Sequence, residues 1–125
     1  MISVEAFEEW LTAYGAAWKA RDPTLAIRIF APDAHYHWTP FGPPKLGHSE
    51  IAAAWGQATS RQQSIDFRYT VWFVDGWRGV AHWHTSFTRT GTGLGVEIDG
   101  VLIAEFDAAG LCRVFREWWH SNEGG

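Results

Sequence analysis

The chain has 125 residues, the length of one ordinary domain, and we treat residues 1–125 as a single domain. Hydrophobic residues make up 46% of it and charged residues 19%, a balance that excludes disordered and fibrous proteins. The net charge of −4, without a cluster of lysine or arginine, argues against nucleic acid or an anionic membrane as a partner.

Two further features bear on the compartment. Cys112 is the only cysteine, which excludes an internal disulfide and fits a reducing environment. The first residues are acidic where a signal peptide is basic, and no apolar run approaches the roughly 20 residues of a membrane span. We therefore expect a cytoplasmic protein.

Three helices are predicted in the first half of the chain. Ser3 caps the first, whose apolar residues recur at spacings of three and four: Phe7, Trp10, Leu11, Tyr14 and Trp18. Asp22 and Pro23 begin a short second helix that runs to about Phe30. A third helix follows a loop rich in proline and glycine (40–50) and ends near Ser60.

Strands account for most of the rest. The residues 34–39 read as a strand before the third helix, and aromatic and β-branched runs follow it at 67–74, 79–88, 96–106 and 112–120. Within these runs, Asp99-Gly100 is most simply a turn or a bulge, and residues 122–125 form a loose tail. Helices followed by strands predict an α+β fold, a cone-shaped roll in which three helices pack on a strongly curved, mostly antiparallel sheet enclosing a pocket.

The aromatic content points to that pocket. Nine tryptophans, eight phenylalanines and three tyrosines exceed what a small core needs, as expected where a cavity must be walled.

Several ordered segments carry a resemblance to a known family: "YGAAWKARDP", "IFAPDA", "HWTPFGPPKLGHSEI" and "EIDGVLIAEFDAAGLCRVFREWWH". With these the chain resembles the SnoaL-like branch of the nuclear transport factor 2-like superfamily, which includes ketosteroid isomerases, polyketide cyclases and limonene epoxide hydrolases. In the ketosteroid isomerase pattern, Tyr14 falls on the tyrosine that donates to the substrate oxygen. The catalytic base falls on Trp38 and the second donor near Leu102, so that mechanism does not carry over.

Glu117 and Tyr14 are the candidate catalytic residues. In the strand "VFREWWHS", Glu117 shares a face with Phe115 and Trp119, and the resemblance turns that face toward the pocket. An inward carboxyl among aromatic rings has its pKa raised toward the range useful for proton transfer. The alternatives are a buried hydrogen bond or an ion pair for Glu117, and a core tyrosine for Tyr14.

Ten aromatic residues are predicted to line or close the pocket, with simple core packing as the alternative reading. They are Trp18, Tyr36, Trp38, Phe41, Trp55, Trp83, Phe87, Phe106, Phe115 and Trp119.

His35/His37 and His82/His84 each occupy alternate strand positions, which puts both rings of a pair on one face, as in many metal sites with histidine ligands. The apolar residues between them, such as Tyr36 and Trp83, claim the inner face, so the histidines belong outside and we expect no metal and no cofactor. The family and the outward parity of residues such as Trp118 imply a homodimer through the outer face of the sheet.

Three functions follow as hypotheses. The first is a cofactor-free acid/base enzyme, such as an isomerase, cyclase or hydratase, acting on a small apolar or polycyclic substrate. The second is a non-catalytic module that binds or senses a hydrophobic metabolite. The third is a protein-interaction adaptor without a buried ligand site.

Overall fold

The computed structural model describes residues 1–124 and consists of three helices and one six-stranded sheet. The helices are α1 (Val4–Ala20), α2 (Pro23–Ile27) and α3 (Gly47–Thr59). The strands are β1 (Phe30–His37), β2 (Lys45–Leu46), β3 (Gln62–Asp75), β4 (Arg78–Arg89), β5 (Gly95–Phe106) and β6 (Cys112–Glu123). Their order is β2-β1-β6-β5-β4-β3, and every neighbouring pair is antiparallel except β1 with β6. The predicted α+β fold is confirmed.

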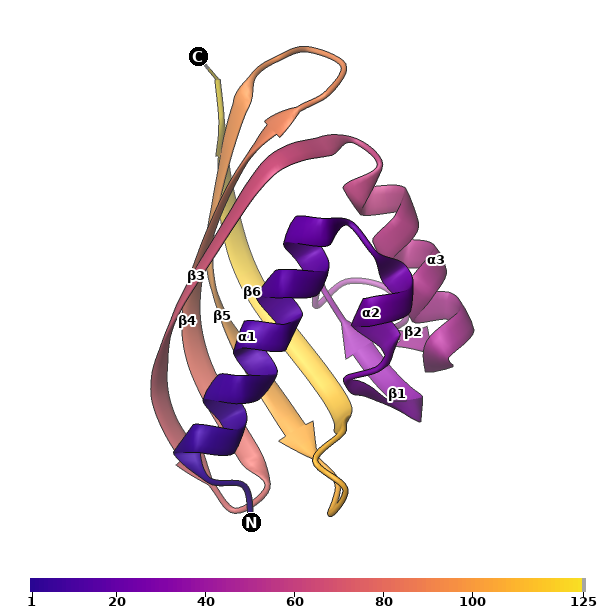
Figure 1. Ribbon diagram of the computed structural model, residues 1–125, viewed down its shortest axis with the longest axis vertical. Coiled ribbons are helices and arrows are strands. Elements are labelled where there is room, and N and C mark those ends of the chain that lie inside the picture. Colours follow the sequence, from indigo (N-terminus) through magenta and orange to yellow (C-terminus); the bar gives the residue numbers. More distant parts are fainter. Residues whose placement is uncertain (125) are drawn as a thin grey trace.

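All three helices lie on one side of a curved sheet that does not close (Figure 1). Helix α1 begins as predicted at Ser3, whose hydroxyl oxygen accepts a hydrogen bond from the Ala6 amide at 3.0 Å. Its apolar stripe is buried, and Gly15 faces β3 so closely that a Cβ there would lie 2.6 Å from the Phe67 ring. The absence of a side chain at Gly15 therefore sets how near α1 comes to the sheet.

The second helix is shorter than predicted and the first strand begins earlier. Helix α2 ends at Ile27, and Phe30 already pairs with Cys112 of β6. The pairing of β1 with β6 then shifts register between Phe30 and His35, across Pro32, which has no amide hydrogen to donate. Pro32 therefore lies within β1, at the point where its pairing with β6 shifts. The sheet also extends further than predicted elsewhere, because β2 forms inside the proline-rich loop and β3 starts at Gln62.

Gly100 is not in a turn or bulge, contrary to the prediction. The β5 register continues through it without a shift, with Trp83 on one side and Trp119 on the other. A Cβ at Gly100 would collide with the Trp118 carbonyl oxygen and lie 2.9 Å from the Trp119 Cβ. Gly100 is thus required for the close approach of β6, which presents Trp119.

The predicted loose tail is also wrong for Asn122 and Glu123. Both continue β6 and pair with β5, and Glu123 receives two hydrogen bonds from Arg89, at 2.7 and 3.1 Å. Gly125 lies outside the described residues.

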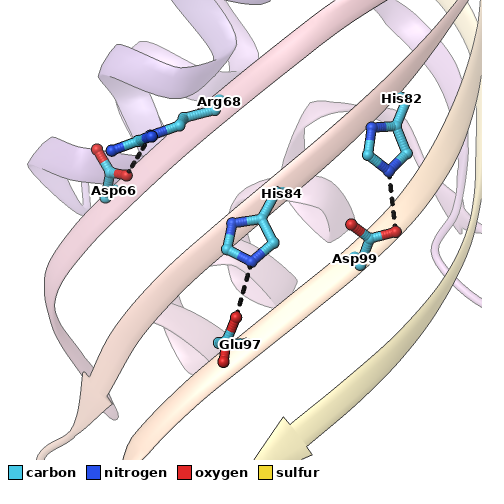
Figure 2. A network of polar contacts seen from close by, with 6 residues as sticks. All are labelled: Asp66, Arg68, His82, His84, Glu97 and Asp99. Carbon is cyan, nitrogen blue, oxygen red and sulfur yellow. Dashed lines mark hydrogen bonds and ion pairs between the residues drawn. The ribbon is translucent and has the colours of Figure 1, made fainter.

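The outer face of the sheet carries the histidines, as predicted. His82 bonds to Asp99 at 2.9 Å and His84 to Glu97 at 3.1 Å, beside the Arg68–Asp66 pair (Figure 2). Trp72 stacks on the His82 ring with the planes 7° apart. Within residues 1–124, no helix has the length and apolar character needed to cross a membrane.

Candidate functional site

A cavity of about 450 Å³ lies between the helices and the inner face of the sheet. Helix α1 contributes Tyr14 and Trp18 to its wall, and α3 contributes Trp55. The full lining is Tyr14, Trp18, Tyr36, Trp38, Trp55, Gln57, Ala58, Thr59, Arg61, Gln62, Trp83, Phe87, Arg89, Val96, Ile98, Glu117, Trp119 and Ser121. The volume is in the range of small-molecule sites in proteins, about 300–1,000 Å³.

A stack of three rings lies under the buried end of the cavity. The Phe115 ring is 4.8 Å from Tyr36, with the planes 11° apart, and 5.5 Å from Tyr14, with the planes 21° apart. Phe115 itself is fully buried. The stack joins α1, β1 and β6 and holds both tyrosine rings in place.

The two tyrosine hydroxyls lie 3.3 Å apart, and one donates to the other. Burial raises the pKa of Tyr14 well above its ordinary value, with smaller contributions from Tyr36 and Glu117, and burial followed by Glu117 does the same for Tyr36. Both hydroxyls therefore keep their protons near neutral pH. One hydroxyl proton forms the hydrogen bond between the two tyrosines, and the other hydroxyl proton can be donated to a ligand oxygen.

Among the described residues that line the cavity, Glu117 is the only one with a carboxyl side chain. It is 7% exposed, and its buried Oε2 atom has no hydrogen-bond partner. Burial alone raises the pKa of its carboxyl to about 8, because water is excluded and no cation compensates the charged form. Near neutral pH, Glu117 is a neutral acid among aromatic rings.

Polar side chains surround the mouth of the cavity, where the C-terminal end of α3 approaches the strand ends. Gln57, Arg61 and Ser121 are exposed, while Arg89 is partly buried. Trp119 is 44% exposed and donates its indole N–H to the Trp38 carbonyl at 2.8 Å, which joins β6 to the end of β1. The cavity therefore has a neutral, aromatic interior and a polar rim that is exposed to solvent.

Comparison with known proteins identifies the family to which this fold belongs. The family model described as "SnoaL-like domain" matches residues 11–115. The chain belongs to this family. It is thereby a member of the nuclear transport factor 2-like superfamily, as the sequence motifs suggested. None of the curated proteins matches the sequence.

A solved structure shows the same fold at low sequence identity. The crystal structure of RV0760c from Mycobacterium tuberculosis is 12% identical, covers 99% of this chain and 100% of its own, and superposes with a TM-score of 0.82. The SnoaL-like fold is therefore shared over the whole length, whereas only one residue in eight or so is the same.

Within this SnoaL-like domain, most predicted pocket residues do face the cavity. Glu117 and Tyr14 do so, with seven of the ten aromatic residues predicted to line it: Trp18, Tyr36, Trp38, Trp55, Trp83, Phe87 and Trp119. The geometry brings these side chains together around one cavity.

Three of the predicted lining residues lie elsewhere. Phe41 is 82% exposed in the proline-rich loop, which carries it away from the sheet. Phe106 is buried edge-on against Phe7 and Trp10 at the other end of the core. Phe115 supports the tyrosines from beneath and does not reach the cavity surface.

Six polar lining residues were not predicted: Gln57, Thr59, Arg61, Gln62, Arg89 and Ser121. Gln62 accepts the Trp18 indole N–H at 2.7 Å and so fixes the ring against the wall. Arg61 and Arg89 were missed because each stands at the end of an element, and strand alternation says nothing about which ends meet in space. Arg89 is the last residue of β4, one position beyond the strand predicted at 79–88.

The ketosteroid isomerase positions take a different form in this SnoaL-like domain. Trp38, at the position of the catalytic base, lines the cavity. Leu102, near the position of the second donor, is fully buried and lies directly opposite Glu117 in the β5–β6 ladder. The carboxyl of this cavity therefore comes from β6, the strand next to the one that carries Leu102, and it lies on the same inner face of the sheet.

The outer histidines do not assemble a metal site in the part of the chain that the structure describes. His82 and His84 each bond to a single carboxylate, and no group of three metal-ligating side chains occurs in residues 1–124.

Glu117 should make stability depend on pH. The folded state keeps its proton up to a pKa of about 8, whereas the unfolded chain releases it near the ordinary pKa of 4.5. Relative to Glu117→Gln, the free energy of unfolding of wild type should therefore fall as pH rises through this window. The total is at most about 5 kcal/mol, at about 1.36 kcal/mol per pH unit. Urea unfolding of both proteins at several pH values measures the difference.

A second variant, Glu117→Leu, removes the same titration without a polar replacement. It should show the same flattened profile relative to wild type. A wild-type profile parallel to those of both variants between pH 4.5 and 8 would contradict the raised pKa.

Proposed function

We propose that this SnoaL-like domain binds a small aromatic or polycyclic molecule in the cavity and transfers a proton to or from it through Glu117. The single observation that carries the proposal is the Glu117 carboxyl, buried without a partner at Oε2 in an aromatic cavity. A carboxyl held in this way costs folding free energy, which is typical of a group kept for function. The reaction class is isomerisation, cyclisation or hydration without a cofactor.

The tyrosine pair supplies the second element of the chemistry. The free hydroxyl proton of Tyr14 or Tyr36 donates to a ligand oxygen, and a keto group held there becomes more acidic at the neighbouring carbon. Ionised Glu117 accepts a proton from that carbon and, as the neutral acid, returns it to another position. The proton count is unchanged, and a carboxyl with a pKa near 8 serves in both directions at neutral to mildly basic pH.

The aromatic wall suits a flat, apolar ligand. The indoles of Trp18, Trp55 and Trp83 surround the space, and the Trp83 indole has a buried N–H group without a partner among the described residues. Such a donor favours a ligand that carries acceptor oxygens on an otherwise apolar body.

The second candidate is a binding or sensing module in which Glu117 orients the ligand and moves no proton. The observation in its favour is that the lining, as far as residues 1–124 form it, holds no second carboxyl or histidine to relay the proton. An adaptor without a ligand is the weakest reading, because it gives no reason for a cavity with a desolvated acid. We place the protein in the cytoplasm, in keeping with its one cysteine, Cys112, buried and free.

Glu117→Gln separates the enzyme from the binding module. A thermal-shift screen of bicyclic ketones, with β-tetralone as the reference, identifies a ligand, since binding to the folded state raises its melting temperature. With that ligand in D₂O, wild type should accelerate exchange of the protons next to the carbonyl, followed by proton NMR. The variant should bind within a few-fold and lose exchange by about 10²–10⁴.

The matched control is Glu105→Gln, a change of the same charge in β5 outside the cavity, where Glu105 pairs with Arg78 at 3.7 Å. It should exchange like wild type. Unchanged exchange in Glu117→Gln would exclude Glu117 as the proton carrier. Binding without any accelerated exchange would favour the sensing module.

We also propose that the outer face of the sheet joins a second copy of the chain. His82, Val101 and Trp118 lie side by side in the ladder, and Trp72 stacks over His82. Trp72 is 56% exposed and Trp118 46%, so the row leaves a large aromatic surface uncovered. The paired charges around it, such as His84 with Glu97, suit the polar rim of an interface.

Replacing Trp72 or Trp118 by arginine should shift the chain from dimer to monomer. Each change puts a charge into the centre of the proposed contact, where desolvation weakens association by at least tenfold. Analytical ultracentrifugation over a range of concentrations measures the shift. Phe41→Arg is the control, because Phe41 is more exposed than either tryptophan and lies outside the sheet. A wild type that stays monomeric would contradict the proposal.

A further inference from the structure

The charged groups of the cavity are segregated. Among the described residues of the interior, one carries a carboxyl group, Glu117, which is neutral near neutral pH. The lining contains two cations, Arg61 and Arg89, and both stand at the end of the cavity where α3 gives way to β3. The mouth is thus positive in a chain whose net charge is −4.

Arg89 is already compensated. Its Nε and Nη2 atoms donate to the two oxygens of Glu123 at 2.7 and 3.1 Å, a bidentate pair. This ion pair holds the end of β4 against the end of β6 and leaves little of Arg89 to attract another anion.

Arg61 is not compensated within residues 1–124. Its backbone is fixed beside the end of β4, because its carbonyl accepts a hydrogen bond from the Thr90 amide at 3.0 Å. Its side chain is exposed and makes no ion pair or hydrogen bond with the described residues, although it lines the cavity. Nearby, Arg21 donates to the Gln62 carbonyl at 3.2 Å, which adds positive charge to the same end of the molecule.

We infer that the ligand carries an anionic head group that meets Arg61 at the mouth while its apolar body fills the aromatic interior. The inference rests on the proposed function, since it names the chemical class of the same ligand. An anion at the Glu117 end would lose its hydration and face a carboxyl, whereas at the mouth it keeps water and gains a guanidinium. A planar guanidinium also binds carboxylate or sulfonate oxygens in pairs.

Two fluorescent probes with the same rings test this directly. 8-Anilinonaphthalene-1-sulfonate carries an anion and N-phenyl-1-naphthylamine is its neutral counterpart. Arg61→Gln should weaken binding of the sulfonate about three- to tenfold at low salt and leave the neutral probe unchanged, with both affinities measured by fluorescence titration. Arg113→Gln is the matched control, because it removes the same charge from an exposed residue at the start of β6 outside the cavity.

Ala58→Trp shows whether the probes enter the cavity. Ala58 lies in the lining on a partly exposed turn of α3, so a larger side chain fills the space from the rim and should reduce binding of both probes. If both probes enter the cavity but Arg61→Gln weakens them equally, or weakens neither, the anionic head group is overturned and the proposed function stands. If neither probe binds wild type, or Ala58→Trp has no effect on them, the proposed function is overturned together with the inference.

Discussion

The stack of Tyr14, Phe115 and Tyr36 is the contact on which the rest of the site depends. It joins the first helix to the two parallel strands β1 and β6, and it does so with rings that lie nearly flat on one another. Stacked rings of this kind contribute beyond the area that they bury. Because Phe115 packs against both tyrosine rings, the next inward residue of β6 has a fixed position as well. That residue is Glu117.

The position of Glu117 sets its chemistry. The inward face of β6 runs from a packed ring at Phe115, through the acid, to a half-exposed ring at Trp119, so the carboxyl stands where the core ends and the cavity begins. It is 7% exposed, and burial is the one cause that raises its pKa. The glycine at position 100 lets β6 approach β5 beside Trp119. The close packing of these strands and the position of Trp119 in the cavity wall therefore both require that residue 100 has no side chain.

Much of this was predictable from local patterns. The spacing of Phe7, Trp10 and Tyr14 predicted a helix and its buried side, and alternation along β6 predicted which residues point inward. Alternation predicts which face of the sheet a side chain lies on, however, and not how deeply it is buried. Phe115 and Glu117 share a face, yet one supports the site and the other belongs to it.

The rest depends on contacts between distant segments. The pairing of Arg89 with Glu123 needs the register of β4, β5 and β6 to be known, since the two residues are 34 positions apart. Gly100 was misread because Asp-Gly is a turn signal in isolation, whereas here the missing Cβ makes room for a neighbouring strand. Arg61 lies at the mouth because it connects the end of α3 to the start of β3, the edge strand of the sheet.

The central claim is that the cavity holds a neutral carboxyl. The most direct test is a carbon-13 NMR titration of the glutamate side-chain carboxyl signals, with the Glu117 signal assigned by its loss in Glu117→Gln. The account predicts a midpoint at a pKa of about 8 for that signal. A midpoint near 4.5, the ordinary value, would show that the carboxyl is hydrated or paired and would contradict the account.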